Sequence, residues 1–287
     1  MVKELTISTS VVPKKLRNIS QPPNRLFTLG VDVNELLLLP SVTIVGSRKV
    51  SAYGKAVTAA LAGDLAKAGV LIISGLALGV DSIAHRAALD VSGVTLAVLP
   101  SPLGNIYPRS HTQLARQIVA QGGALVSEYA EGERVYPVNF IARNRITSGL
   151  GDVLLITEAA EKSGTLHTAR FALEQGKEVL AVPGNITSNT SRGTNNLIKS
   201  GATPVTCVDD VLRALGLEQL LKAGKPPPKG ATSEEQAVLD LLSAGVSDGA
   251  LLLAQSGLSV ALFNQTLTML EIRGLVRALG GNHWALI

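Results

Sequence analysis

The sequence is poor in cysteine, in aromatic residues and in charge. Its 287 residues include one cysteine, Cys207, which excludes an internal disulfide and any zinc site built from several cysteines. Aromatic residues make up only 3% of the chain, so the core must be aliphatic. No apolar run approaches the roughly 18–20 residues needed to cross a bilayer, and no N-terminal segment has the pattern of a signal peptide. We therefore expect a cytoplasmic protein without a membrane partner.

The few charges are slightly unbalanced. Charged residues make up 17% of the chain and hydrophobic residues 46%, a composition typical of a globular protein with a large core. The formal net charge of +4 permits an anionic partner without requiring one. The length is sufficient for one large domain and one small one.

Residues 42–215 alternate between short apolar runs and helix-like stretches. This alternation predicts an α/β fold, with a parallel sheet covered by helices on both faces. Strands are expected at 42–45, 70–74, 94–99, 124–127, 152–157, 178–182 and 203–207. Helices are expected at 52–68, 80–89, 110–120, 144–150, 165–175, 195–199 and 209–215, the first of them capped by Ser51.

Three further segments lie on either side of this pattern. Residues 1–41 are expected to be a lead-in with a short turn of structure at 26–30 and no chemistry. Residues 216–232 contain a triple proline and several lysines, which indicates a stiff, basic linker. Residues 233–287 predict three helices and a hairpin, a winged-helix pattern, with Ser233 and Gln236 forming a capping box.

The third helix of this small unit would be the recognition helix of a duplex-DNA reader. Residues 260–270 contain no Lys or Arg, although a groove reader needs cations for the phosphates. A structural or protein-contact role is therefore favoured.

Four loops follow predicted strands and combine small residues with hydrogen-bond donors. Parallel strands bring such loops to one edge of the sheet, where open α/β sheets bind ligands. Backbone N–H groups at a helix start and an arginine fork are suited to phosphate. The loops are Gly46-Ser47-Arg48 with Lys49, Ser74-Gly75 to Asp81, Glu158 to Thr165 with Ser163-Gly164-Thr165, and Pro183-Gly184-Asn185.

Residues 140–145 form the densest basic and aromatic segment. Arg143 and Arg145 can pair with phosphates, and Phe140 offers a ring face for a base. The alternative is that Phe140 belongs to the core and that the arginines lie on a helix surface.

Two carboxylates and two histidines are candidates for catalysis or metal binding. Asp81 and Glu158 could act as an acid–base pair, but helix capping, orientation of Arg48 or a structural place at the strand end are also open to them. His85 and His167 have no second ligand at metal spacing. No serine lies in a G-x-S-x-G elbow. We expect no catalytic residue, metal or cofactor.

The order of these motifs resembles the DNA-processing protein A (DprA/Smf) family. The resemblance runs from about residue 26 to residue 215 and rests on Gly46-Ser-Arg48, Tyr53-Gly54, Ser74-Gly75 to Asp81, Ala84-His85, Ile106-Tyr-Pro108, Ser127-Glu128, Arg143-Asn-Arg145, Ser163-Gly-Thr165, Thr168-Ala169, Ser191 to Asn195 and Leu197-Ile198. Leu78 stands where that family usually carries arginine, and Ile141 replaces a usual proline.

The resemblance implies an extended Rossmann-like fold with a C-terminal winged-helix domain. It also implies sequence-independent binding of single-stranded DNA and loading of RecA recombinase during natural transformation or recombination, usually by a homodimer. The expected DNA-binding residues are Gly46, Ser47, Arg48, Lys49, Gly75, Phe140, Arg143, Asn144, Arg145, Ser163, Gly164 and Thr165.

The alternative function is that of an enzyme. Related Rossmann-like proteins hydrolyse nucleoside monophosphates and carry a Pro-Gly-Gly-x-Gly-Thr loop with a nearby glutamate. Pro183-Gly184-Asn185 lacks that pattern, and Ser163-Gly164-Thr165 matches it only in part. The binding protein is therefore the favoured interpretation.

Overall fold

The structure is a computed structural model that describes residues 8–219 and 229–286. The chain divides into two compact units, Met1–Leu220 and Leu221–Ile287. Each unit has its own core, which is aliphatic in the first unit and includes Phe263 in the second.

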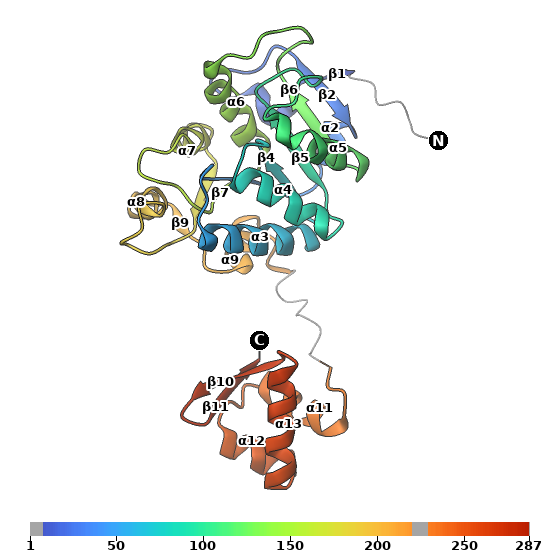
Figure 1. The fold of residues 1–287 in the computed structure, drawn as a ribbon, viewed down its shortest axis with the longest axis vertical. Coiled ribbons are helices and arrows are strands. Elements are labelled where there is room, and N and C mark those ends of the chain that lie inside the picture. Colours follow the sequence, from blue (N-terminus) through green and yellow to red (C-terminus); the bar gives the residue numbers. More distant parts are fainter. Residues whose placement is uncertain (1–7, 220–228, 287) are drawn as a thin grey trace. The chain divides into compact units, whose positions relative to one another are not determined.

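Within the described residues, the first unit is built on a nine-stranded sheet (Figure 1). Neighbouring strands follow the order β1-β2-β6-β5-β4-β3-β7-β8-β9. All pairs from β6 to β9 are parallel, whereas β2 is antiparallel to β6 and β1 is antiparallel to β2. The strands are β1 Ser8–Ser10, β2 Leu26–Gly30, β3 Ser41–Val45, β4 Leu71–Ser74, β5 Thr95–Leu99, β6 Ala124–Ser127, β7 Val153–Ile156, β8 Glu178–Ala181 and β9 Thr203–Pro204.

Helices cover both faces of this sheet, which confirms the predicted fold class. Because side chains alternate along a strand, Leu96 and Val98 of β5 pack with Ile146, whereas Ala97 and Leu99 pack with Leu114. The helices are α1 Lys14–Arg17, α2 Val33–Leu36, α3 Ala52–Lys67, α4 Val80–Asp90, α5 Thr112–Ala120, α6 Pro137–Leu150, α7 Thr165–Glu174, α8 Arg192–Lys199 and α9 Val208–Ala214, with a 3-10 turn at Arg109–His111.

The strand order fixes where a ligand can bind. From β3 the chain proceeds outward through β4, β5 and β6, and it then returns to the other side of β3 with β7. The loops after β3 and β7 therefore leave the sheet in opposite directions and open a crevice between them. Such a topological switch point is the usual ligand site of an open α/β sheet.

Several predicted boundaries were wrong. Helix α6 begins at Pro137 rather than at residue 144, since proline suits the first turn of a helix. The short turn expected at 26–30 is strand β2, which extends the sheet antiparallel to β6. Helix α8 begins at Arg192 rather than at residue 195, and β9 is shorter than expected.

Among its described residues, 229–286, the second unit has three helices and a two-stranded hairpin, as predicted for a winged helix. They are α11 Ser233–Ser243, α12 Gly249–Ser256, α13 Val260–Ile272, β10 Val276–Gly280 and β11 His283–Leu286. The cap of α11 is Thr232, whose side chain accepts a hydrogen bond from Glu235 N, and not Ser233 as expected. Most of the predicted linker, including its prolines, lies outside the described residues.

Among the described residues, no single helix has the length and apolarity to span a bilayer. Helices α12 and α13 pass that test only as a pair bent by 116°.

Candidate functional site

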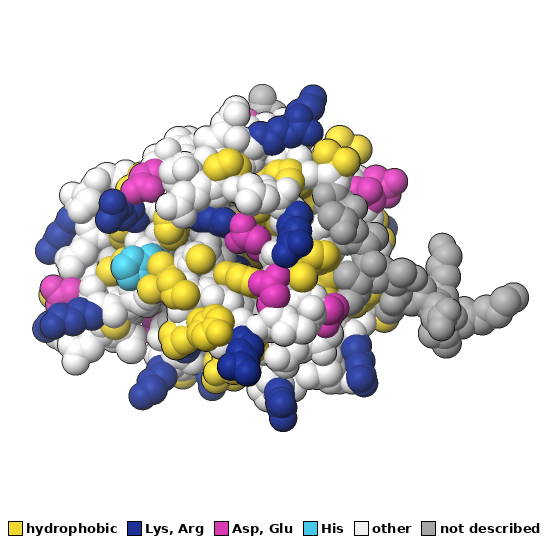
Figure 2. All heavy atoms as spheres, turned by 90° about the horizontal axis from the view of Figure 1, so that it is seen from above, with side chains coloured by type: hydrophobic (Ala, Val, Ile, Leu, Met, Phe, Trp, Pro, Cys, Tyr) yellow, Lys and Arg dark blue, Asp and Glu magenta, His cyan; other side chains and the backbone are white. Residues whose placement is uncertain are grey.

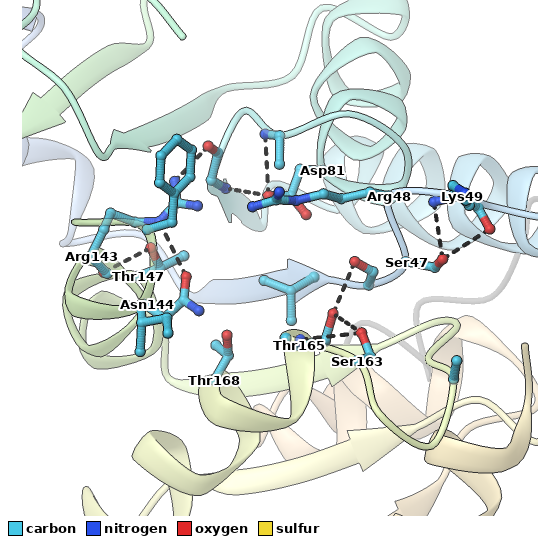
Figure 3. A pocket seen from close by; sticks show the side chains of 18 of the residues that line it. Ser47, Arg48, Lys49, Asp81, Arg143, Asn144, Thr147, Ser163, Thr165 and Thr168 are labelled. Carbon is cyan, nitrogen blue, oxygen red and sulfur yellow. Dashed lines mark hydrogen bonds between the residues drawn. The ribbon is translucent and has the colours of Figure 1, made fainter. Parts of the chain in front are cut away.

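A cavity of about 530 Å³ opens at the switch point between β3 and β7 (Figure 3). In Figure 3, Arg48 and Asp81 lie on one side of it, and Ser163, Thr165 and Thr168 lie on the opposite side. Eleven of the twelve residues proposed from the sequence line this cavity: Gly46, Ser47, Arg48, Lys49, Gly75, Phe140, Arg143, Asn144, Ser163, Gly164 and Thr165.

Hydrogen bonds hold the backbone of the loop after β3, whereas its two cationic side chains are exposed. Ser47 N donates to Glu158 O at 2.8 Å, and Ser47 Oγ donates to Lys49 O at 2.9 Å. Position 46 must be glycine, because a Cβ there would lie 2.6 Å from Cγ2 of Val80. Arg48 and Lys49 are exposed, and neither forms an ion pair with another described residue. Two cations are therefore available at the cavity mouth.

Arg143 reaches the cavity from α6 but is 4% exposed. Its Nη1 donates to the carbonyl oxygens of Gly75 and Val98, at the ends of β4 and β5. Burial lowers the pKa of Arg143 to about 10, so the guanidinium remains charged at neutral pH. This corrects the expectation of a freely pairing arginine: Arg143 joins two strand ends and contributes positive charge from below the surface.

Asp81 holds the loop after β4. Its Oδ2 accepts hydrogen bonds from Gly75 N at 3.1 Å and from Ala77 N at 3.4 Å. Burial raises the pKa of this carboxyl, while the nearby Arg143 guanidinium opposes the rise. Asp81 thus holds the backbone of this loop, a role that was not among those the sequence left open.

Arg145 lies outside the cavity. Two residues along α6 correspond to about 200° around the helix, so Arg145 points away from the face that carries Arg143. It is 7% exposed, and its Nη2 lies 2.6 Å from Glu128 Oε1 in an ion pair. The expectation that Arg145 pairs with phosphates does not fit this position.

The segment Ser163–Thr165 joins the loops after β7 and β3. Thr165 Oγ1 donates to Gly46 O at 3.0 Å, and Thr165 N donates to Ser163 Oγ at 3.2 Å. The cap residue of α7 is Gly164, with no side-chain cap, so neither Ser163 nor Thr165 caps the helix as one interpretation expected. Gly164 is exposed and lines the cavity at the start of α7, but the N–H groups of Thr165, Leu166 and His167 already donate to Ser163 and Gly164.

The guanidinium group of Arg48 lies over the ring of Phe140. Cζ of Arg48 lies 5.4 Å from the ring centroid, within the range of a cation–π contact. Tyr107 packs against the same ring, with centroids 5.1 Å apart and planes at 77°. No pattern in the sequence placed Tyr107 here, because it comes from the long connection after β5.

Apart from Asp81, the residues considered for catalysis or metal binding do not line the cavity. Glu158 accepts two hydrogen bonds from Ser51 at the start of α3. His85 is fully buried, and His167 is exposed on α7. In the part of the chain that the structure describes, no three His, Cys, Asp or Glu residues are grouped so as to hold a metal ion.

Comparison with known proteins identifies the family. The profile described as DNA recombination-mediator protein A matches residues 3–216, and that of the DprA winged helix domain matches residues 222–282. The chain belongs to the DprA family. Protein Smf of Escherichia coli (strain K12) is 46% identical over 205 residues, which cover 71% of this chain and 54%, about half, of the E. coli protein. DNA processing protein DprA of Bacillus subtilis is 37% identical over 214 residues, covering 75% of this chain and 71% of that protein.

Two solved DprA structures share the fold. DprA of Streptococcus pneumoniae superimposes with a TM-score of 0.67 at 36% identity, covering 72% of this chain and 74% of that chain. DprA of Helicobacter pylori, described in terms of its single-stranded DNA binding mode, gives a TM-score of 0.66 at 36% identity, covering 76% of this chain and 97% of that chain. The predicted family and fold are thus confirmed.

Proposed function

We propose that this DprA-family protein binds single-stranded DNA without sequence preference, with phosphates in the cavity between β3 and β7. The observation that carries this proposal is the pair Arg48 and Lys49, exposed at the cavity mouth without carboxylate partners among the described residues. The buried charge of Arg143 adds to an anion site there.

One face of the molecule, shown in Figure 2, fits local contacts rather than a broad basic patch. On the face seen in Figure 2, Lys and Arg side chains are interspersed with acidic and hydrophobic ones. A few placed cations, rather than a large positive field, would then hold the strand. The single-stranded DNA binding mode described for H. pylori DprA supports the choice of ligand.

The proposal includes delivery of the bound strand to RecA recombinase by a homodimer in the cytoplasm. The family description as a recombination mediator supports the RecA step. RecA binding to a labelled strand, measured with and without this protein, tests that step, and sedimentation tests the dimer.

The proposal contains no catalytic step. The enzyme alternative needs a free carboxylate beside the bound phosphate. Asp81 and Glu158 both accept backbone N–H groups, so each has a structural task. Hydrolysis of nucleoside monophosphates is therefore the less favoured function.

Titration of the purified chain with labelled oligo-dT at two salt concentrations tests the binding function. Because phosphate contacts release counterions, affinity should fall steeply with salt, with a slope of about −0.7 per neutralised phosphate of a single strand. Affinity that is absent, or unaffected by salt, would overturn the proposal.

A further inference from the structure

A second, smaller cavity of about 70 Å³ adjoins the first. The two cavities are adjacent, because five residues line both: Arg48, Gly75, Ala77, Phe140 and Arg143. The small one adds Leu78, Tyr107 and two prolines, whereas the large one adds hydroxyl groups and Lys49. Arg48 thus separates a polar, cationic side from an apolar, aromatic side.

The apolar side is open to solvent. Leu78 is 50% exposed and Tyr107 is 49% exposed, although both are large apolar side chains next to a cation. Single exposed apolar residues need no explanation, but apolar groups gathered beside convergent polar groups mark a binding site. The ligand that matches both sides is anionic on one side and flat and apolar on the other, as a nucleotide is.

The half-buried Phe140 ring already has two neighbours in this site. Arg48 lies over its face and Tyr107 packs against it in a T-shaped contact. Phe140 therefore positions those two side chains, and the planar groups left facing solvent are the guanidinium of Arg48 and the ring of Tyr107. The sequence suggested Phe140 itself as the stacking residue, whereas this inference gives the exposed stacking role to its two neighbours.

We propose that the bases of the bound strand lie on Leu78, Tyr107 and the guanidinium plane of Arg48, which we call the base surface. This inference rests on the proposed function, because the phosphates of the same strand occupy the large cavity. In a nucleotide the base and the phosphate project from different positions of the sugar, so a strand that crosses Arg48 can use both sides. Stacking on ring and guanidinium planes tolerates any base, which agrees with binding without sequence preference.

The test compares oligo-dT with an abasic oligonucleotide of equal length, at one salt concentration, by fluorescence anisotropy with the full chain. The abasic strand keeps every phosphate and loses every base. Wild-type protein should bind oligo-dT about tenfold or more tightly than the abasic strand, since stacking contributes about 1–3 kcal/mol per base. Tyr107→Leu and Leu78→Ala should each weaken oligo-dT binding about five- to tenfold and leave abasic binding unchanged.

Two control variants distinguish the loss of a stacking face from a general effect of substitution. Tyr107→Phe keeps the ring and should stay within about twofold of wild type. Leu38→Ala removes an equally large exposed side chain that lines neither cavity and should have no effect. The salt slope should be the same for Tyr107→Leu as for wild type, because no phosphate contact is lost.

The outcomes separate this inference from the proposed function. If neither strand binds, both the proposed function and the base surface are rejected. If both strands bind wild type equally well, the base surface is rejected while phosphate binding stands. If Tyr107→Leu and Leu78→Ala weaken both strands equally, their role is structural and the base surface is again rejected.

Discussion

Ser51 donates two hydrogen bonds to Glu158, from Oγ to Oε1 at 2.6 Å and from the backbone N to Oε2 at 2.8 Å. Ser51 Oγ also accepts from Gly54 N and so caps α3. Glu158 follows β7 and is 1% exposed. The pair therefore fixes the start of α3 to the end of the neighbouring strand, and this carboxylate has no free oxygen directed at the cavity.

Replacement of Glu158 should affect stability rather than activity. Glu158→Ala leaves Ser51 N without its buried partner, at a cost of about 1–3 kcal/mol in the free energy of unfolding. Glu158→Gln retains an acceptor for Ser51 N and should cost less. Chemical denaturation measures both variants. Release of free base from AMP by wild type, lost in Glu158→Gln, would instead revive the enzyme alternative.

The carboxylate of Glu158 also leaves no space for a side chain at Gly54 of α3. A Cβ at Gly54 would lie 2.7 Å from Glu158 Oε2, which its two hydrogen bonds hold in place. Gly54→Ala should therefore lower the Tm, although alanine inside a helix normally stabilises by about 1 kcal/mol relative to glycine. Gly63 is the matched control in the same helix, because its Cβ would meet only Ala87 O at 3.7 Å. Gly63→Ala should leave the Tm unchanged or raise it, and equal effects of the two variants would contradict this reasoning.

The spacing of apolar runs and turn residues was enough to predict the seven parallel strands and the edge where their loops meet, but not the antiparallel strands β1 and β2. Buried strands such as Leu71–Ser74 are short apolar runs between turn signals, so their pattern is local. The start of α6 was missed because Pro137 was not recognised as a first-turn residue, and that error placed Phe140 and Arg143 outside the helix. Arg143 lines the cavity and Arg145 pairs with Glu128 because the two side chains project from different sides of α6. That difference can be predicted only when both residues are placed in the helix.

Contacts between distant segments could not be predicted. Tyr107 reaches Phe140 from the connection after β5, and Ser51 reaches Glu158 across more than a hundred residues. Nothing in the spacing of either pair indicates the contact, because tertiary packing determines it. Likewise, the sequence identified Glu128 only within the Ser127-Glu128 motif and not as the ion-pair partner of Arg145.

Arg48 should be the phosphate contact whose loss is measured most directly. Arg48→Ala should weaken oligo-dT binding by about tenfold or more, because it removes a charge-assisted contact worth about 1.5–3 kcal/mol and, in the base surface, one stacking plane. The magnitude of the salt slope should fall by about 0.7. Arg170→Ala is the control, since Arg170 is exposed on α7 and lines neither cavity. Unchanged affinity of Arg48→Ala in anisotropy titrations would count against the site.

Because His85 is buried, we expect the free energy of unfolding to depend on pH. Thr95 Oγ1 donates to Ile72 O and so accepts from Nδ1–H of His85, whose Nε2 has no partner among the described residues. Burial lowers the pKa of His85 to about 3, with the charges of His111 and Arg143 adding to the effect. The neutral ring is the folded form, so its contribution to stability is complete above pH 6.5 and is lost as the pH falls from 6.5 towards 3.

The measurement is the free energy of unfolding as a function of pH for wild type and His85→Asn. Over this window wild type should lose about 1.4 kcal/mol per pH unit more than the variant, which corresponds to one proton. His167→Asn, at an exposed position on α7, should follow wild type. Parallel curves for wild type and His85→Asn would show that His85 does not titrate in this way.

The winged-helix unit should add no affinity for duplex DNA through α13. The helix has no Lys or Arg, and its outer side exposes Leu262, Met269 and Ile272. From residue 229 to residue 286 carboxylates outnumber cations, so the surroundings do not replace the missing charge. Gln265 lies on the exposed side between Leu262 and Met269.

Gln265→Glu places a negative charge where a groove-bound helix would face phosphates. A helix lying in the groove would then lose about tenfold or more in affinity, because like charges repel strongly at a desolvated contact. We expect Gln265→Glu to bind both duplex and single-stranded oligonucleotides as wild type does. Arg48→Ala, weakened on the single strand in the same titrations, shows that the assay detects the loss of one contact. A selective loss of duplex binding in Gln265→Glu would place α13 on DNA after all, whereas equal binding leaves its apolar side available to a protein.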